Sequence, residues 1–298
     1  MTQFLTEDDF TRLRDIRATR PEAIRDALTG RRRRDVLRGD GRLFIVAADH
    51  PARGALAVAA NPTAMADRYD LLDRLATALS RPGVDGVLGT PDNVEDQAAL
   101  GLHDDKIVVG SMNRGGLRGA SFELDDRMTA YDVRTMVASG IDFAKTLVRI
   151  DLADSGTVST LTAMAGAVTE ASTAGLPIML EPFLSTRSDG RVVNDLSTDA
   201  VILSIAIASG LGASSANTWM KLPVVDDMER VMAATTMPTL LLGGDSGVDP
   251  DETFASWEDA LSLPGVRGLT VGRTLLYPPD DDVAAAVDIA AGLVHTDL

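Results

Sequence analysis

Residues 142–151 read DFAKTLVRID and place Lys145 and Arg149 inside an otherwise apolar run. The run is too short for a helix and does not alternate between polar and apolar residues, so it predicts a strand buried on both faces. Side chains alternate between the two faces of a strand. One face of this strand should therefore carry Lys145, Leu147, Arg149 and Asp151.

Seven further runs of the same kind occur along the chain, separated by segments with helical periodicity. They are residues 43–49 (LFIVAAD), 86–90 (GVLGT), 106–111 (KIVVGS), 178–183 (IMLEPF), 218–223 (TWMKLP), 239–245 (TLLLGGD) and 268–273 (GLTVGR), with helices expected in segments such as 62–79, 195–209 and 283–294. No composition break or Gly/Ser linker divides them. The pattern predicts the α/β class and a single (β/α)8 TIM barrel over residues 43–298.

Residues 1–42 predict an N-terminal helical extension, with Thr6 as a cap and a second helix start at Pro21-Glu22. The run Arg31–Arg34 has two interpretations. It could form a nucleic-acid patch, but such runs are more often a solvated helix end or a partner surface.

The composition excludes several classes of function. With 28 basic and 44 acidic residues the net charge is −16, which argues against non-specific nucleic-acid binding and attraction to an anionic membrane. The chain has no Cys, so it has no thiolate nucleophile and no Cys-ligated metal, and we expect no cofactor. No long apolar segment or signal-peptide pattern occurs, and the default expectation is a cytoplasmic enzyme.

Only three lysines occur in 298 residues. Lys106 begins its run, whereas Lys145 and Lys221 lie inside theirs, towards the strand ends where barrel enzymes carry their chemistry. A buried amine beside a second cation is pushed towards its neutral form, which can attack a carbonyl and form a Schiff base. The alternative is a structural ion pair with Glu181, Asp49 or Asp151. A carboxylate within reach could also move the protons of aldol chemistry, which favours a catalytic site.

An anion site is predicted at the ends of the seventh and eighth strands. Gly243 and Gly244 permit close approach of backbone N–H groups, Ser246 adds a hydroxyl, and Arg273 follows Gly272. Tight turns with a surface arginine are the alternative.

His50 follows the first strand directly. The other histidines, His103 and His295, lie near a helix–strand junction and the C-terminus, so we expect no His-rich metal site. We group His50 with the substrate-binding residues.

Several of these strand ends resemble the class I aldolase superfamily of (β/α)8 barrels, which includes deoxyribose-phosphate, tagatose-bisphosphate and archaeal-type fructose-bisphosphate aldolases. The similarity spans about residues 40–295 and rests on AADH at 47–50, GIDFAK at 140–145, LEP at 180–182, MKLP at 220–223, the glycine pair at 243–244 and Gly272-Arg273.

The resemblance implies a role for each matching residue. Lys221 matches the Schiff-base lysine and Lys145 the lysine of the fourth strand. Asp49 and Glu181 match acids of the first and fifth strands. The phosphate-binding loops of the family correspond to Gly243, Gly244 and Arg273.

The chain also departs from the family pattern. Arg149 stands where several relatives place a tyrosine, and the loop HPARGAL after Asp49 has two residues more than the family's DQRGSL-like form. The added arginine suits a second anionic group, a carboxylate or second phosphate, unless it pairs with Asp151.

The chain looks closest to a branch associated with inositol catabolism. That likeness implies cleavage of 5-dehydro-2-deoxygluconate 6-phosphate to dihydroxyacetone phosphate and malonate semialdehyde, with deoxyribose-phosphate or ketose-bisphosphate cleavage as alternatives. Two other classes stay open: a non-catalytic phosphate-binding barrel that acts through its N-terminal extension, and an isomerase that uses Glu181 or Asp49 as base. Acidic barrels of this kind often form symmetric homo-oligomers.

Overall fold

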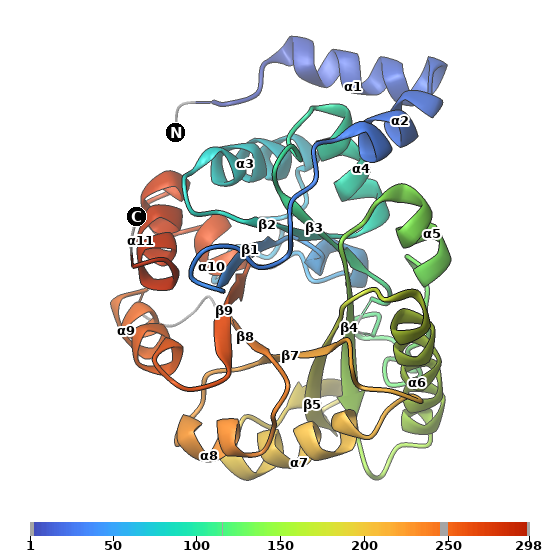
Figure 1. The fold of residues 1–298 in the computed structure, drawn as a ribbon, viewed down its shortest axis with the longest axis vertical. Helices are drawn as coiled ribbons and strands as arrows, with labels where there is room; N and C mark the ends of the chain where they lie inside the picture. Colours follow the sequence, from blue (N-terminus) through green and yellow to red (C-terminus); the bar gives the residue numbers. More distant parts are fainter. Residues whose placement is uncertain (1–2, 115, 245–249, 297–298) are drawn as a thin grey trace.

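The computed structural model describes residues 3–114, 116–244 and 250–296. Eight parallel strands pair in chain order, and the last pairs with the first, which closes a barrel (Figure 1). They are β1 (Leu43–Ala47), β2 (Gly86–Gly89), β3 (Ile107–Ser111), β4 (Phe143–Ile150), β5 (Ile178–Ser188), β7 (Thr218–Leu222), β8 (Thr239–Leu242) and β9 (Val266–Val271). The predicted single (β/α)8 barrel is confirmed, and each strand overlaps one of the runs picked out in the sequence.

Each barrel strand is followed by a helix that covers the outside of the barrel (Figure 1). These helices are α3 (Arg68–Ser80), α4 (Pro91–Ala99), α5 (Val133–Ser139), α6 (Gly156–Ala174), α7 (Thr198–Ser209), α8 (Met228–Ala233), α9 (Pro250–Leu261) and α11 (Val283–Val294), with a short α10 (Arg273–Leu276) before the last and a 3-10 turn, η1 (His50–Arg53), after β1. In the described residues no helix has both the length and the apolarity needed to cross a membrane.

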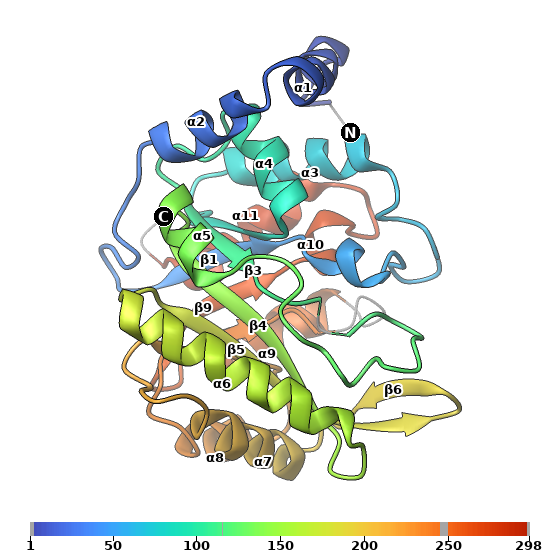
Figure 2. The same ribbon diagram turned by 90° about the vertical axis from the view of Figure 1, so that its right-hand side faces the viewer.

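A ninth strand was not predicted. β6 (Arg191–Asn194) pairs antiparallel with the end of β5, which continues beyond the predicted limit at Phe183 (Figure 2). The two strands are joined through Asp189 and Gly190, whose φ angles are 50° and 75°. Asp-Gly is a strong two-residue hairpin signal because both positions tolerate positive φ. The hairpin extends β5 past the barrel rim and brings Val192 and Asn194 over the open end.

Towards the amino ends of the strands, the barrel interior is filled by an inner apolar layer. This layer comprises Leu43, Ile45, Ala47, Leu88, Ile107, Val109, Phe143, Met179, Trp219 and Leu240. Phe143 and Trp219 meet edge to face across it, with ring centroids 5.4 Å apart, a favoured aromatic geometry. The inner apolar layer closes the amino end of the barrel. Polar side chains nearer the carboxyl ends of the strands can therefore be reached only from the carboxyl end.

The N-terminal extension begins with α1 (Glu7–Thr19) and α2 (Glu22–Gly30), which lie outside the ring of barrel helices (Figure 2). The predicted cap is present, since Thr6 and Asp9 form a capping box. Leu5, Phe10 and Leu13 pack on α3 and hold α1 against the barrel. The expectation of helix through residue 42 is wrong beyond Gly30, where the chain becomes extended and leads into β1.

The run Arg31–Arg34 is not a solvated helix end. Arg31 and Arg33 both pair with Asp142, and Arg34 pairs with Asp85. The Arg31 and Asp142 side chains are only 2% and 3% exposed, and Arg31 also donates to the Gly140 and Lys106 carbonyls. Unpaired buried charges are costly. The need to reach acids at the amino end of the barrel therefore explains why this segment is extended.

At the amino end of the barrel His295 ties the C-terminal segment to the residues that precede β1 and β2. Its Nδ1 lies 2.8 Å from Asp40 Oδ2 and its Nε2 lies 3.0 Å from Asp85 Oδ2. Since both partners are carboxylates, the ring is held as imidazolium. The hydrogen bond to Asp85 raises the pKa of His295 despite burial, and Asp40 adds to the effect. Arg34 faces the same cluster through Asp85.

A pH-dependent contribution to stability follows from the His295 contacts. Because the folded pKa of His295 is raised above its ordinary value of 6.5, its contribution is complete below that value and is lost as pH rises through the folded pKa. We expect His295→Gln to lower the free energy of unfolding by about 2 kcal/mol at pH 6. The loss should shrink in alkaline solution. Urea unfolding of both proteins from pH 5.5 to 9.5 measures the difference, and a pH-independent difference contradicts the assignment.

Candidate active site

A charged layer lies directly above the inner apolar layer. Because side chains on a strand alternate, Lys145, Glu181 and Lys221 each share the interior face with a residue two positions earlier. Those earlier residues are Phe143, Met179 and Trp219 of the inner apolar layer. Asp49 follows β1 and completes the charged layer. All four sequence-predicted catalytic side chains therefore meet in one place.

The four groups form a chain of ion pairs in the order Asp49, Lys145, Glu181, Lys221. Lys145 Nζ donates to Asp49 Oδ2 at 2.8 Å and lies 2.7 Å from Glu181 Oε2, at an angle outside hydrogen-bond geometry. Lys221 Nζ donates to Glu181 Oε1 at 2.8 Å. The two lysine side chains are 4% and 6% exposed. Of the ion pairs considered as a structural alternative, those with Glu181 and Asp49 are present. Lys145 lies against two carboxylates and Lys221 against one, a difference that bears on the chemistry.

The two amines differ in proton affinity. Burial lowers the pKa of Lys221, and the positive charge of Lys145 lowers it further, although Glu181 and Asp49 oppose both effects. Burial also acts on Lys145, but its two carboxylate partners outweigh it and raise the pKa of Lys145. Lys221 is therefore the amine that is more easily neutral, and Lys145 is the fixed cation beside it.

The two carboxylates stay ionised although they are buried. Burial alone favours the neutral acid, but Lys145 and Lys221 overcome it and bring the pKa of Glu181 to about 2. In the same way Lys145 and Lys221 hold the pKa of Asp49 well below its usual range. The layer thus pairs two carboxylates with two ammonium groups.

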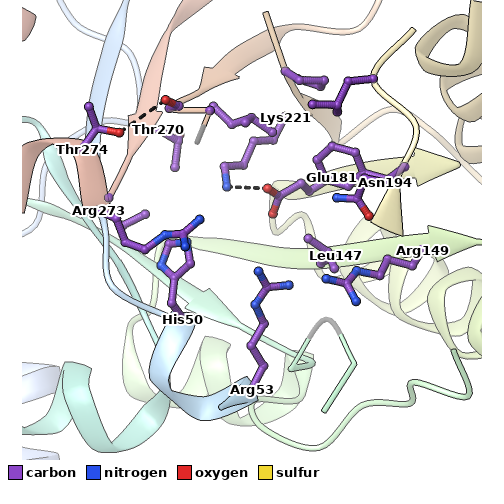
Figure 3. Close-up of a pocket in the computed structure, with 18 of the residues that line it drawn as sticks. His50, Arg53, Leu147, Arg149, Glu181, Asn194, Lys221, Thr270, Arg273 and Thr274 are labelled. Atoms are coloured by element: carbon purple, nitrogen blue, oxygen red, sulfur yellow. Dashed lines mark hydrogen bonds and ion pairs between the residues drawn. The ribbon is translucent and has the colours of Figure 1, made fainter. Parts of the chain in front are cut away.

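A cavity of about 400 Å³ opens above this layer at the carboxyl end of the barrel. Figure 3 shows Lys221 and Glu181 on one side of it, with His50, Arg53, Arg149 and Arg273 turned towards the same space. Among the described lining residues the cationic side chains are Arg53, Arg118, Arg149, Arg273 and Lys221, against two carboxylates, Glu123 and Glu181. A cavity of this charge in a chain of net charge −16 suits an anionic ligand.

The predicted anion-binding residues lie together along the β8 and β9 ends of the cavity. Gly243, Gly244, Gly272 and Arg273 all line it, and Thr274 donates to the Gly243 carbonyl. A side chain at Gly272 would put its Cβ 2.3 Å from the Ala47 carbonyl oxygen, so only glycine fits there. Ser246 lies outside the described residues.

Arg149 lies on the far side of the cavity and does not pair with Asp151. Its Nη1 donates to Glu123 at 2.5 Å; the Glu123 side chain is buried and that of Arg149 is 11% exposed. Asp151 instead accepts the Ala153 N–H in a local turn. Burial and the neighbouring charge of Arg53 lower the pKa of Arg149, and its Nε has no hydrogen-bond partner among the described residues. Arg149 is thus paired with one carboxylate and keeps one N–H group without a partner among the described residues.

His50 stands at the start of η1, between the charged layer and Arg273 (Figure 3). Nδ1 lies 3.8 Å from Asp49 Oδ1, beyond hydrogen-bond distance, and is buried without a partner. Burial and then the charges of Arg273, Arg53 and Lys221 lower the pKa of His50 to about 3, against the opposing charge of Asp49. The ring is therefore neutral near pH 7. The described residues contain no group of three or more His, Asp and Glu side chains arranged for a metal ion.

Comparison with known proteins places the chain in a family. A family model described as Cgl0159-like matches residues 41–291. The chain belongs to the Cgl0159-like family. Cgl0159 from Corynebacterium glutamicum, whose crystal structure is known, has 69% sequence identity to this chain. The comparison covers 99% of this chain and all of that chain, and the two structures superpose with a TM-score of 0.97. No curated protein matches the chain at a significant level.

More distant structures share the fold of this Cgl0159-like chain. An archaeal fructose 1,6-bisphosphate aldolase is 19% identical over 91% of this chain and 98% of its own, with a TM-score of 0.63. A fructose-bisphosphate aldolase from Slackia heliotrinireducens is 15% identical over 98% of this chain and 88% of its own, also at 0.63. A third structure is described as an archaeal fructose-1,6-bisphosphate aldolase with its catalytic Lys bound to the carbinolamine intermediate; it is 19% identical over 91% of this chain and 99% of its own, at 0.61. At these identities the likeness establishes a shared barrel fold.

Several cavity residues of this Cgl0159-like chain were not predicted. They are Arg53, Arg118, Glu123 and Asn194. Arg118 and Glu123 belong to the segment between β3 and α5, which has no helix or strand among its described residues. Long irregular segments in compact domains are often functional, so the length of this segment was a signal that it could contribute residues to the site. The pairing of Glu123 with Arg149 could not, because it depends on how the segment folds back over β4.

Proposed function

We propose that this chain is a class I aldolase, which cleaves or forms a carbon–carbon bond in a phosphorylated sugar or keto acid through a Schiff base on Lys221. The supporting observation is the unequal pair of buried lysines around Glu181. Lys221 lines the cavity and has a lowered pKa, whereas Lys145 lies behind it with a raised one. The lowered pKa makes it easier for the Lys221 ammonium group to lose a proton, and the resulting neutral amine is the group that carbonyl addition requires.

The carboxylates supply the proton transfers of this chemistry. Glu181 Oε1 is 2.8 Å from the Lys221 nitrogen, so it can take the proton that the amine loses before attack and return one when the carbinolamine loses water. Asp49 does not touch Lys221. It holds Lys145 in place and thereby keeps a cation beside the nucleophile.

The phosphate of the substrate binds at the β8 and β9 ends in this proposal. Gly243, Gly244 and Gly272 let a ligand approach the backbone closely, and Arg273 supplies positive charge next to them. The carbonyl carbon would then lie between this site and Lys221, which faces it across the cavity (Figure 3).

Opposite the phosphate, a second anionic group would meet Arg149. A second cavity of about 560 Å³ adjoins the first and shares Arg118, Glu123 and Arg149 with it. Arg191, from the β5–β6 hairpin, adds a further guanidinium there. A substrate with a phosphate at one end and a carboxylate or phosphate at the other fits this charge distribution. We therefore favour 5-dehydro-2-deoxygluconate 6-phosphate, whose cleavage gives dihydroxyacetone phosphate and malonate semialdehyde.

A cleavage assay tests the proposed reaction. The purified protein is incubated with 5-dehydro-2-deoxygluconate 6-phosphate, fructose 1,6-bisphosphate, tagatose 1,6-bisphosphate and deoxyribose 5-phosphate, and the aldehyde and ketone products are followed by mass spectrometry. We expect turnover of at least one of them, with the carboxylate-bearing compound fastest. Absence of cleavage with every compound, together with phosphate binding, would point to the non-catalytic barrel.

Replacement of Arg149 by Met should change substrate preference more than reaction rate. The guanidinium lies away from Lys221 and meets the far end of the substrate, so its loss removes binding energy there. We expect KM for the preferred doubly anionic substrate to rise by about tenfold or more, equivalent to about 1.4 kcal/mol. Deoxyribose 5-phosphate, which lacks the second anion, should be little affected. Equal losses for singly and doubly anionic substrates would rule out this role.

A further inference from the structure

The proposed reaction needs a group that exchanges a proton with the substrate hydroxyl, and most acidic or basic groups in the cavity are already committed. Glu181 is held between two ammonium groups, and Glu123 is paired with Arg149. Asp49 and Lys145 are not among the residues that line the cavity. Within the described lining, His50 is the remaining group whose proton can move without the loss of an ion pair.

The surroundings of His50 hold its ring at the cavity surface. η1 is closed by hydrogen bonds from Gly54 and Ala55 to the His50 carbonyl oxygen. The missing side chain at Gly272 leaves room for the ring, because a Cβ there would lie 3.1 Å from His50 Cε1. Neither ring nitrogen has a hydrogen-bond partner among the described residues, and Nδ1 faces the Asp49 carboxylate at 3.8 Å. The His50 side chain is 18% exposed and lines the cavity, so its ring can form a hydrogen bond with a substrate.

We propose that His50 is a catalytic residue, which takes the proton of the substrate hydroxyl as the carbon–carbon bond breaks, once the phosphate of the substrate has bound beside Arg273. This inference rests on the Schiff-base function proposed above. The electron pair of the breaking bond moves towards the iminium carbon on Lys221 and gives the enamine. The O–H pair becomes the new aldehyde carbonyl, and the proton passes to an imidazole nitrogen of His50. The reverse transfer serves bond formation.

The phosphate requirement follows from the charges around the ring. The cations Arg273, Arg53 and Lys221 oppose protonation of His50, and the Asp49 carboxylate favours it. A phosphate dianion next to Arg273 offsets part of this positive charge. The bound substrate thus raises the proton affinity of the ring and brings it into a range suited to base catalysis.

Histidine NMR tests the coupling without any turnover. The chain has only three histidines, so the His103 and His295 ring signals are internal controls far from the cavity. The ring nitrogens of 15N-labelled protein are followed from pH 5 to 8, with and without inorganic phosphate. We expect His50 to stay neutral throughout without phosphate. With phosphate its titration midpoint should rise by about two units or more, so that the ring becomes protonated at the acidic end of this range. Phosphate should leave the His103 and His295 ring signals unchanged.

Kinetics tests the proton transfer itself. For the compound that the wild type cleaves, His50→Ala should lower kcat by about 10²-fold or more, and added imidazole should restore part of it. His50→Gln keeps a hydrogen-bond donor but no base and should be equally slow. Adduct formation between Lys221 and dihydroxyacetone phosphate should persist in both variants, because it precedes bond cleavage.

The outcomes separate this inference from the proposed function. If His50→Gln raises KM and leaves kcat unchanged, or if phosphate shifts neighbouring amide signals but leaves the His50 titration unmoved, His50 only binds the ligand and the inference fails while the aldolase stands. If phosphate fails to bind, the inference also fails. If the wild type forms no adduct with any carbonyl compound, the Schiff-base function itself is wrong.

Discussion

Lys221→Met should abolish turnover and adduct formation. The thioether fills a volume close to that of the lysine stem but cannot add to a carbonyl, so the covalent route is lost. We expect kcat/KM to fall by about 10³-fold or more. Glu181 keeps Lys145 as its ion-pair partner, so the variant should fold. Near-normal cleavage by the folded variant would assign the chemistry to another group.

Lys106→Met is the matched control for Lys221→Met. Lys106 also lies in a barrel strand region, but its Nζ donates to the Val84 carbonyl at the opposite end of the molecule. Since the chain has only three lysines, this variant also shows whether an adduct depends on lysine number or on the particular lysine. We expect wild-type kinetics.

Lys145→Met should leave the nucleophile in place but protonated. Lys145 is the positive charge that opposes protonation of Lys221, and its removal leaves both Glu181 and Asp49 to stabilise the Lys221 ammonium form. The pKa of Lys221 should therefore rise. The rate of adduct formation at pH 7 should fall by at least about tenfold, and its rising pH limb should move to higher pH. An unchanged limb would show that Lys145 has no electrostatic role.

The same substitution should be costly for folding, because Asp49 loses the ammonium group that neutralises it. We expect the free energy of unfolding to fall by about 3–5 kcal/mol. The double variant Lys145→Met with Asp49→Asn removes the stranded carboxylate and should recover much of this loss, measured by urea unfolding. It also takes away one acid that acts on Lys221. Part of the alkaline shift should therefore reverse as well.

The fold was predictable because each barrel strand is an apolar run buried on both faces. Such a pattern is dictated by burial alone and needs no knowledge of neighbours, as in Leu43–Ala47 and Thr218–Leu222. The β5–β6 hairpin was not predicted because it extends past the barrel and lacks a buried apolar run, although Asp189-Gly190 was a readable turn signal. The prediction of helix after Gly30 was wrong because the arginines of this segment pair with Asp142 and Asp85, which lie far away in sequence.

The charged layer could be predicted for a similar reason. A lysine inside an apolar strand stands out in a chain that uses arginine for nearly all its positive charge, and strand alternation then fixes which way Lys145 points. The alternation of side chains along a strand does not predict which side chains of different strands form ion pairs. The sharing of Glu181 by Lys145 and Lys221, and the contact of Arg149 with Glu123, arise only when the barrel closes and the β3–α5 segment folds over it.

The charge distribution links the composition to the site. The chain as a whole is strongly acidic, yet cations predominate among the described residues that line the cavity. Repulsion of anions by the general surface and attraction at the cavity would together guide a negatively charged substrate to Lys221. In the proposed aldolase, the acidic composition would thus help to direct the substrate to the cavity.

Borohydride reduction followed by peptide mapping tests the central claim most directly. The wild-type protein is mixed with dihydroxyacetone phosphate or acetaldehyde, reduced, digested and analysed by mass spectrometry. The account predicts one covalent adduct, carried by the peptide that contains Lys221, and its absence from Lys221→Met. An adduct on Lys145 or Lys106, or an unmodified protein with both compounds, would contradict it.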